Sequence, residues 1–160
     1  MSETFIQRVC LEGISAAFIA VAFAMLFSVP VRYLKYVALG GLMTRVLRTL
    51  LFNGLGIEVA IATFIACCVT SLYFIYQAPK LGVPRPVFTV ASIIPLIPGM
   101  DAYTCLMSLY SVIDAPVNEI AQNAYLIIHH GMRCFAILLS IALGIAIPPL
   151  FFYRFRTNVY

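Results

Sequence analysis

Long apolar runs alternate with short polar segments along this chain. One run, Gly13–Val31, contains no charged residue, and a helix that crosses a bilayer needs about 20 predominantly apolar residues. The pattern predicts five such helices, at residues 13–29, 34–51, 57–76, 87–110 and 117–152. We therefore expect an all-α, polytopic integral membrane helical bundle in which residues 1–160 form a single transmembrane domain.

The basic residues between these runs indicate an orientation. With five spans, one side of the membrane carries Arg32, Lys35, Lys80, Arg85, Arg154 and Arg156, whereas four spans would divide the basic residues evenly. Because cytoplasmic loops are enriched in Lys and Arg, we favour five spans with the N-terminus outside. The segment 34–51 is short and contains two arginines, so its complete crossing stays open. Gln77–Pro86 is rich in turn-forming residues and predicts a loop.

Composition excludes several classes of protein. A hydrophobic fraction of 63%, a charged fraction of 10% and a mean hydropathy of +1.03 are outside the range of soluble domains. The net charge is only +4 and the basic residues are scattered, which argues against a nucleic-acid partner. We find no catalytic motif, and the five cysteines lack metal-ligand spacing, so we expect neither an enzyme nor a cofactor or metal site.

One predicted span is interrupted by helix-breaking residues. Pro95 and Pro98 each remove a backbone donor and clash with the preceding turn, and Gly99 then frees the backbone. In a membrane, irregular backbone is tolerated only inside protein or along a water-filled cavity. Asp101 follows two residues later and is the only charged residue between Pro86 and Ile113. Broken helices with ionisable groups form the binding sites of many transporters, so this segment indicates transport.

Two arginines in the second predicted helix admit two interpretations. Arg45 and Arg48 are three residues apart and share a helix face with Gly41 and Thr44. A guanidinium inside a bundle could bind the carboxylate of an anionic substrate. Alternatively, both side chains could extend from the end of a short helix to the membrane interface.

The other polar residues of the predicted helices also admit more than one interpretation. Asp101 either complements the dipole at the start of a half-helix or binds a coupled proton. Tyr103 and Thr104 could present hydroxyl groups to the same opening. Glu58 is more simply a residue at the start of a helix, although it is also a proton-coupling candidate. His129 and His130 are adjacent and point about 100° apart on a helix, so they are better explained as core or interface histidines.

Several short segments are typical of one family of membrane proteins. They are Phe23-Ala24-Met25, Val29-Pro30-Val31-Arg32, Gly54-Leu55, Ile57-Glu58, Val87-Phe88-Thr89-Val90-Ala91, Ile94-Pro95, Pro98-Gly99 and Ala102-Tyr103-Thr104. With these segments the chain resembles, over about residues 15–156, the small subunits of the two-component threonine/serine exporter family. The resemblance implies functional positions at Arg48, Glu58, Pro95, Pro98, Gly99, Tyr103 and Thr104. Asp101, Arg45 and the two histidines do not match the family pattern.

The resemblance also implies a function. It implies a five-helix half of a bacterial inner-membrane exporter of small carboxylates, such as succinate-like dicarboxylates, or of amino acids. The partner would be a larger membrane subunit that carries a cytoplasmic domain, and a higher oligomer is compatible with this. From size alone, five helices leave little room for a central site, so a second half is expected. The alternative is a membrane scaffold or assembly subunit that does not transport.

We expect the substrate site to contain Arg48, Pro98, Gly99, Tyr103 and Thr104. In this mechanism the half-helix that starts at Gly99 directs backbone N–H groups at the substrate carboxylate. Arg48 supplies the cation, and Asp101 carries a coupled proton.

Overall fold

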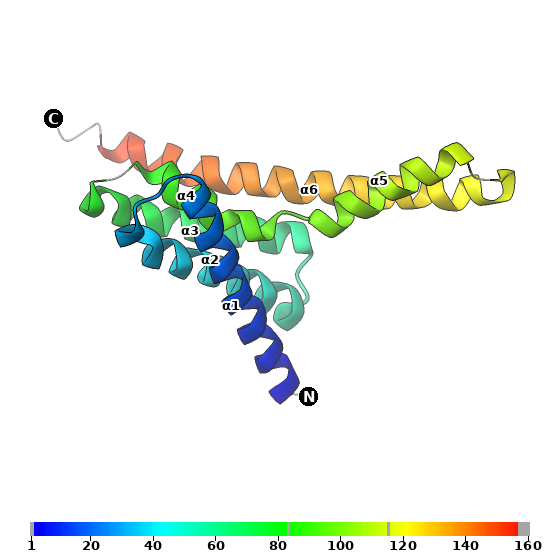
Figure 1. Ribbon diagram of the computed structural model, residues 1–160. Coiled ribbons are helices and arrows are strands. Elements are labelled where there is room, and N and C mark those ends of the chain that lie inside the picture. The colour runs from blue at the N-terminus through cyan, green and yellow to red at the C-terminus, as the bar shows by residue number, and fades with distance from the viewer. Residues whose placement is uncertain (1, 83, 115, 157–160) are drawn as a thin grey trace. The chain divides into compact units, whose positions relative to one another are not determined.

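The computed structural model describes residues 2–82, 84–114 and 116–156, which form helices and contain no strand. The long helices are α1 (Ser2–Leu26), α2 (Leu34–Thr49), α3 (Val59–Leu81), α4 (Arg85–Ile93), α5 (Gly99–Asp114) and α6 (Val117–Arg156). Short turns are η1 (Val31–Tyr33), the π-helical η2 (Leu50–Gly54) and η3 (Ile94–Leu96). Figure 1 shows their order along the chain. The predicted all-α class is confirmed.

Three of the described helices are long and apolar enough to cross a membrane, within α1, α3 and α6. A fourth crossing results if Arg85–Leu96 and Gly99–Ile113 are counted together as one span. Helix α2 has 16 residues, fewer than a helix needs to cross a hydrocarbon core of about 30 Å. Five crossings and the orientation of the chain therefore stay predictions.

The predicted loop at Gln77–Pro86 is wrong over most of its length. Helix α3 continues to Leu81 and α4 begins at Arg85. Pro79 is accommodated in the last turn of α3, where few backbone bonds remain to be lost. The helix ends at Gly82, whose φ of +65° is the left-handed conformation typical of a residue that stops a helix.

The chain divides into two compact units. The first unit comprises Met1–Leu96 and Ser140–Tyr160, and the second comprises Ile97–Leu139. The first thus contains α1 to α4 and the C-terminal part of α6, while the second contains α5 and the N-terminal part of α6. The chain passes from one unit to the other inside the proline-rich segment.

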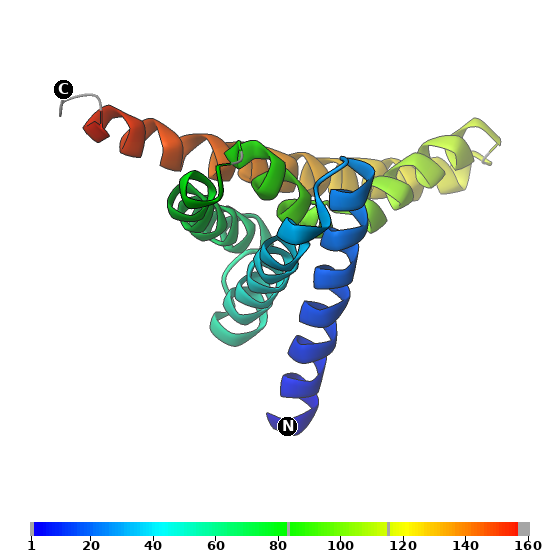
Figure 2. The ribbon, with the colours of Figure 1, turned by 60° about the vertical axis from the view of Figure 1, so that its left-hand side comes forward.

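Small residues bring α1 and α2 together in the first unit. Ala16, Ala20 and Ala24 are buried on α1 at intervals of four residues. A Cβ atom built on Gly41 of α2 would lie 2.6 Å from the Ala20 Cβ and 3.0 Å from the Ala16 carbonyl oxygen. The two helices run side by side in Figures 1 and 2. Such small-residue faces are how membrane helices approach closely enough to gain packing energy.

An aromatic cluster joins α2, α3 and α4. Phe74 and Phe88 are both fully buried, and their rings stack with centroids 5.6 Å apart. Tyr33 meets Phe88 edge-on at 5.8 Å. Gly40 leaves the space for this cluster, because a Cβ there would lie 2.7 Å from the Phe74 Cζ. The first unit therefore has a packed interior against which polar side chains can be positioned.

Candidate functional site

The helical backbone is interrupted between η3 and α5. The Gly99 N–H donates to the Ile97 carbonyl at 2.9 Å, and the Ala102 N–H donates to the Pro98 carbonyl at 3.0 Å. Pro98 is buried and Gly99 is exposed. Because Pro98 has no N–H, the ladder cannot continue through it, and α5 begins anew at Gly99. One of the N–H groups assigned to substrate above is thus engaged within the chain.

Arg48 lies next to the end of this interruption in the first unit. Its Nη1 donates to the carbonyl oxygen of Leu96, the last residue of η3, at 3.1 Å. Leu96 itself is fully buried. A buried carbonyl at the end of a helical segment needs a donor, and the guanidinium supplies one. The observed contact of Arg48 is therefore with the broken backbone.

Asp101 is held by two basic side chains of α6 in the second unit. Its Oδ1 lies 2.8 Å from the His130 Nδ1, and its Oδ2 lies 3.7 Å from the Arg133 Nε. The exposed fractions of the Asp101, His130 and Arg133 side chains are 17%, 23% and 42%. Asp101 is thus a member of a charged cluster and more than a residue that starts a helix.

The pairing of Asp101 with His130 and Arg133 was not predicted, although the sequence contains a partial signal for it. If the chain turns near residues 115–116 into two antiparallel helices, residues that are equally far from the turn along the sequence lie opposite each other. Asp101 and His130 satisfy this relation, and so do Cys105 and Ile127, whose thiol and carbonyl groups lie 3.6 Å apart. The relation needs the position of the turn to within about one residue, and the predicted spans leave it anywhere between residues 110 and 117.

The other predicted site residues have separate positions. Tyr103 is 59% exposed on α5, and the Thr104 hydroxyl donates to the Met100 carbonyl at 2.9 Å. Glu58 is exposed immediately before α3, without a side-chain bond that caps this helix. Arg48 and Glu58 belong to the first unit, and Pro98 to Thr104 belong to the second.

Arg45 takes part in a polar network that the sequence did not reveal. Glu12 on α1 accepts from the Thr49 hydroxyl at 2.8 Å and lies 3.3 Å from the Arg45 Nε, both on α2. Arg8 meets the second Glu12 oxygen at 3.2 Å. Arg45 is therefore paired with a carboxylate of α1 that it shares with Arg8.

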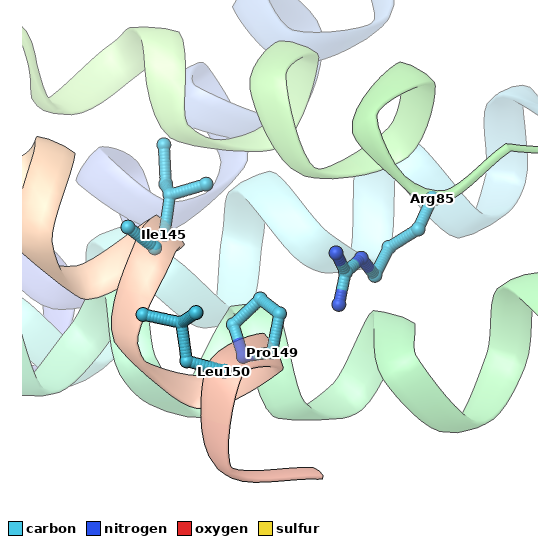
Figure 3. Close-up of a pocket in the computed structure, with 5 residues that line it drawn as sticks. Arg85, Ile145, Pro149 and Leu150 are labelled. Carbon is cyan, nitrogen blue, oxygen red and sulfur yellow. The ribbon is translucent and has the colours of Figure 1, made fainter. Parts of the chain in front are cut away.

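A cavity of about 500 Å³ lies in the first unit. It is lined by Arg85, Ile145, Ala146, Pro149 and Leu150. Figure 3 shows the Arg85 side chain extending from α4 toward the α6 segment that carries the other residues. Among the described residues, no group of three or more His, Cys, Asp or Glu side chains could hold a metal ion.

Comparison with known proteins assigns the chain to a family. The family model described as "Threonine/Serine exporter, ThrE" matches residues 12–151. The chain belongs to the threonine/serine exporter family. The family resemblance noted in the sequence is thereby confirmed, and with it a membrane protein of a transport family.

One relative of known sequence is similar to nearly the whole chain. An uncharacterized protein of Haemophilus influenzae is 33% identical over 150 residues, which cover 94% of this chain and 50% of the relative. This chain thus spans half the length of that exporter-family relative. No solved structure matches.

Proposed function

We propose that this chain is a membrane subunit of a secondary transporter in a bacterial inner membrane. It exports small carboxylates, such as succinate-like dicarboxylates, or amino acids, together with a larger membrane subunit that carries a cytoplasmic domain. Membership of an exporter family supports this proposal. The relative of twice the matched length supports the need for a second half, because it joins a segment similar to this chain to as many further residues.

The observation that carries the proposal is the interruption between Leu96 and Gly99 in a chain of this family. Interrupted helices in membrane proteins persist where they are buried in protein or line water. In transporters, half-helix ends at such interruptions bind the substrate. Asp101 in the first turn of α5 places an ionisable group beside the interruption.

Within this function we assign roles to individual side chains. Arg48 contacts the substrate carboxylate, since a guanidinium matches the geometry of a carboxylate with two parallel N–H bonds. Pro98 and Gly99 maintain the interruption, and Tyr103 and Thr104 orient the solute. Asp101 is the first proton-coupling candidate, and the exposed Glu58 is the second.

A second candidate function is a scaffold or assembly subunit that does not transport. The bond from Arg48 to the Leu96 carbonyl favours it, because that contact stabilises the broken backbone without any solute. In this case the two prolines simply shape a packing surface.

Water access to the interruption distinguishes the two functions. Single cysteines at Tyr103 and at Leu96 would be placed in a background without the five native cysteines. Transport predicts that the Tyr103→Cys variant reacts with a hydrophilic thiol reagent in membranes and that a small substrate slows the reaction. Leu96→Cys, at a fully buried position, is the matched control and should stay protected. Protection of both variants would support the scaffold.

A further inference from the structure

The second unit contains a compact charged cluster that we define as Asp101, His130 and Arg133. Helix α5 and the first half of α6 form an antiparallel hairpin in Figures 1 and 2. Asp101 comes from α5, and His130 and Arg133 come from α6, where they are three residues apart and share a face. The cluster is therefore assembled by the hairpin alone.

The hairpin is close-packed next to the cluster. A Cβ built on Gly131 would lie 3.4 Å from the Cys105 sulfur, and the Cys105 thiol meets the Ile127 carbonyl. This contact fixes the register of α5 against α6 one turn away from Asp101. The 2.8 Å distance between Asp101 and His130 follows from this register.

The charge of the cluster changes by one when His130 takes up a proton. With the tautomer that carries hydrogen on Nδ1, neutral His130 donates to the Asp101 carboxylate, and Arg133 balances its charge. A proton from water that adds to Nε2 converts the imidazole to imidazolium and leaves a net charge of +1. The titratable and charged groups described around His130 are Asp101 and Cys105 on α5, and His129 and Arg133 on α6.

An uncompensated charge is costly in such surroundings. The α6 segment Glu119–Phe152 is apolar enough to lie in a bilayer, and ionic groups there are stabilised only by opposite charges. Arg133 is the most exposed member of the cluster, and its 3.7 Å separation from Asp101 is longer than a good hydrogen bond. Its guanidinium can therefore turn toward a second carboxylate once His130⁺ holds Asp101.

We propose that the Asp101–His130–Arg133 cluster binds one proton and one carboxylate together. The proton adds to the His130 Nε2, the carboxylate binds Arg133, and both leave in the reverse step, so that the one bound carboxylate group offsets the charge of +1 on the protonated cluster. The inference rests on the proposed function, but it moves the coupled proton from Asp101 to its partner His130, with Asp101 ionised, and it adds Arg133 as a substrate contact of the exporter. Linkage requires that the anion favours protonation of His130 as much as the proton favours the anion.

The chain has two histidines, which makes this linkage directly measurable. In the His129→Gln variant, His130 is the only imidazole of the full chain, held in lipid nanodiscs and labelled with ¹³C-histidine. NMR titration then reports its protonation between pH 5 and 8, the range in which imidazole changes charge. We expect succinate or threonine to raise the titration midpoint by about one pH unit, which corresponds to about tenfold tighter binding to the protonated cluster.

Substitution of Arg133 supplies the control. Arg133→Gln should abolish the shift in the same single-histidine background, and Arg133→Lys should retain part of it. A midpoint that neither solute moves, or an equal shift in the Arg133→Gln variant, would overturn the proposal. If the complex exports succinate or threonine while the midpoint stays fixed, the cluster proposal fails and export stands. If the midpoint moves while the complex exports neither solute, the export proposal fails and this anion site stands.

Discussion

The two units of the chain treat their polar groups differently. In the first unit, hydroxyl side chains are buried among helices and bond to each other or to backbone, as Thr44 and Thr70 do at 2.7 Å, whereas the ion pairs of Glu12 are partly exposed. In the second unit, one charged cluster is partly exposed on a hairpin whose apolar side chains also face outward, with Met100 78% and Ile113 76% exposed. Buried, satisfied hydrogen bonds specify one packed arrangement, whereas a partly exposed ionic cluster can exchange partners. We therefore propose that the buried hydroxyl pairs of the first unit hold its shape and that the charged cluster of the second unit responds to ligands and protons.

The largest effect on export is expected at Arg48. This side chain belongs to the packed first unit, yet we assign it a contact with the substrate. Arg48→Gln should lower export about ten- to hundredfold, because a charge-assisted contact to the carboxylate is lost. Lys35→Gln removes the same charge from an exposed position of the same helix and should export normally. Efflux by the assembled complex measures both variants. Normal export by Arg48→Gln would restrict Arg48 to its bond with Leu96.

The same substitution in each unit tests the difference in packing. Gly41→Ala places a methyl group against the Ala16 backbone and should destabilise the fold by about 1–3 kcal/mol. Gly99→Ala meets nothing within 4 Å and should change stability by less than about 1 kcal/mol. Thermal unfolding in detergent, followed by circular dichroism, compares them. Equal losses in both variants would contradict the proposed difference in packing.

The hydroxyl pair of the first unit gives a finer test. Thr44→Val leaves the fully buried Thr70 hydroxyl without this partner and should cost about 1–2 kcal/mol. The Thr44→Val, Thr70→Val double variant should recover part of that loss, because both polar groups are then removed. Thr104→Val in the second unit removes only a bond to its own helix and should cost less than about 0.5 kcal/mol. The same unfolding assay separates the three variants.

The smallest effect concerns the pH dependence of export. Asp101→Asn keeps the shape of the side chain but removes the charge that His130 faces at 2.8 Å. We expect export to continue with a changed pH profile between pH 5 and 8, since protonated His130 then lacks its ionised partner. Efflux at a series of pH values provides the measurement. An unchanged profile would reduce Asp101 to a residue that starts a helix.

Local features of this protein could be predicted from its sequence, and long-range pairings could not. The apolar runs predicted the helices because burial in a bilayer dictates length and composition, and Pro98 with Gly99 predicted where α5 begins. The pairing of Glu12 with Arg45 depends on how α1 packs against α2, which a single-helix pattern does not contain. The pairing of Asp101 with His130 depends on the register of a hairpin. The predicted loop at Gln77–Pro86 was wrong because packing of Ala78 in the core outweighs one lost backbone bond at Pro79.

Efflux from a reconstituted complex tests the central claim most directly. The chain and its larger partner would be co-purified, placed in liposomes and loaded with a panel of dicarboxylates and amino acids. We expect at least one of these solutes to leave the liposomes faster with the complete complex than with the partner alone. If every solute leaves at the same rate from liposomes with the complete complex and from liposomes with the partner alone, the proposed transport function is contradicted and a scaffold is favoured.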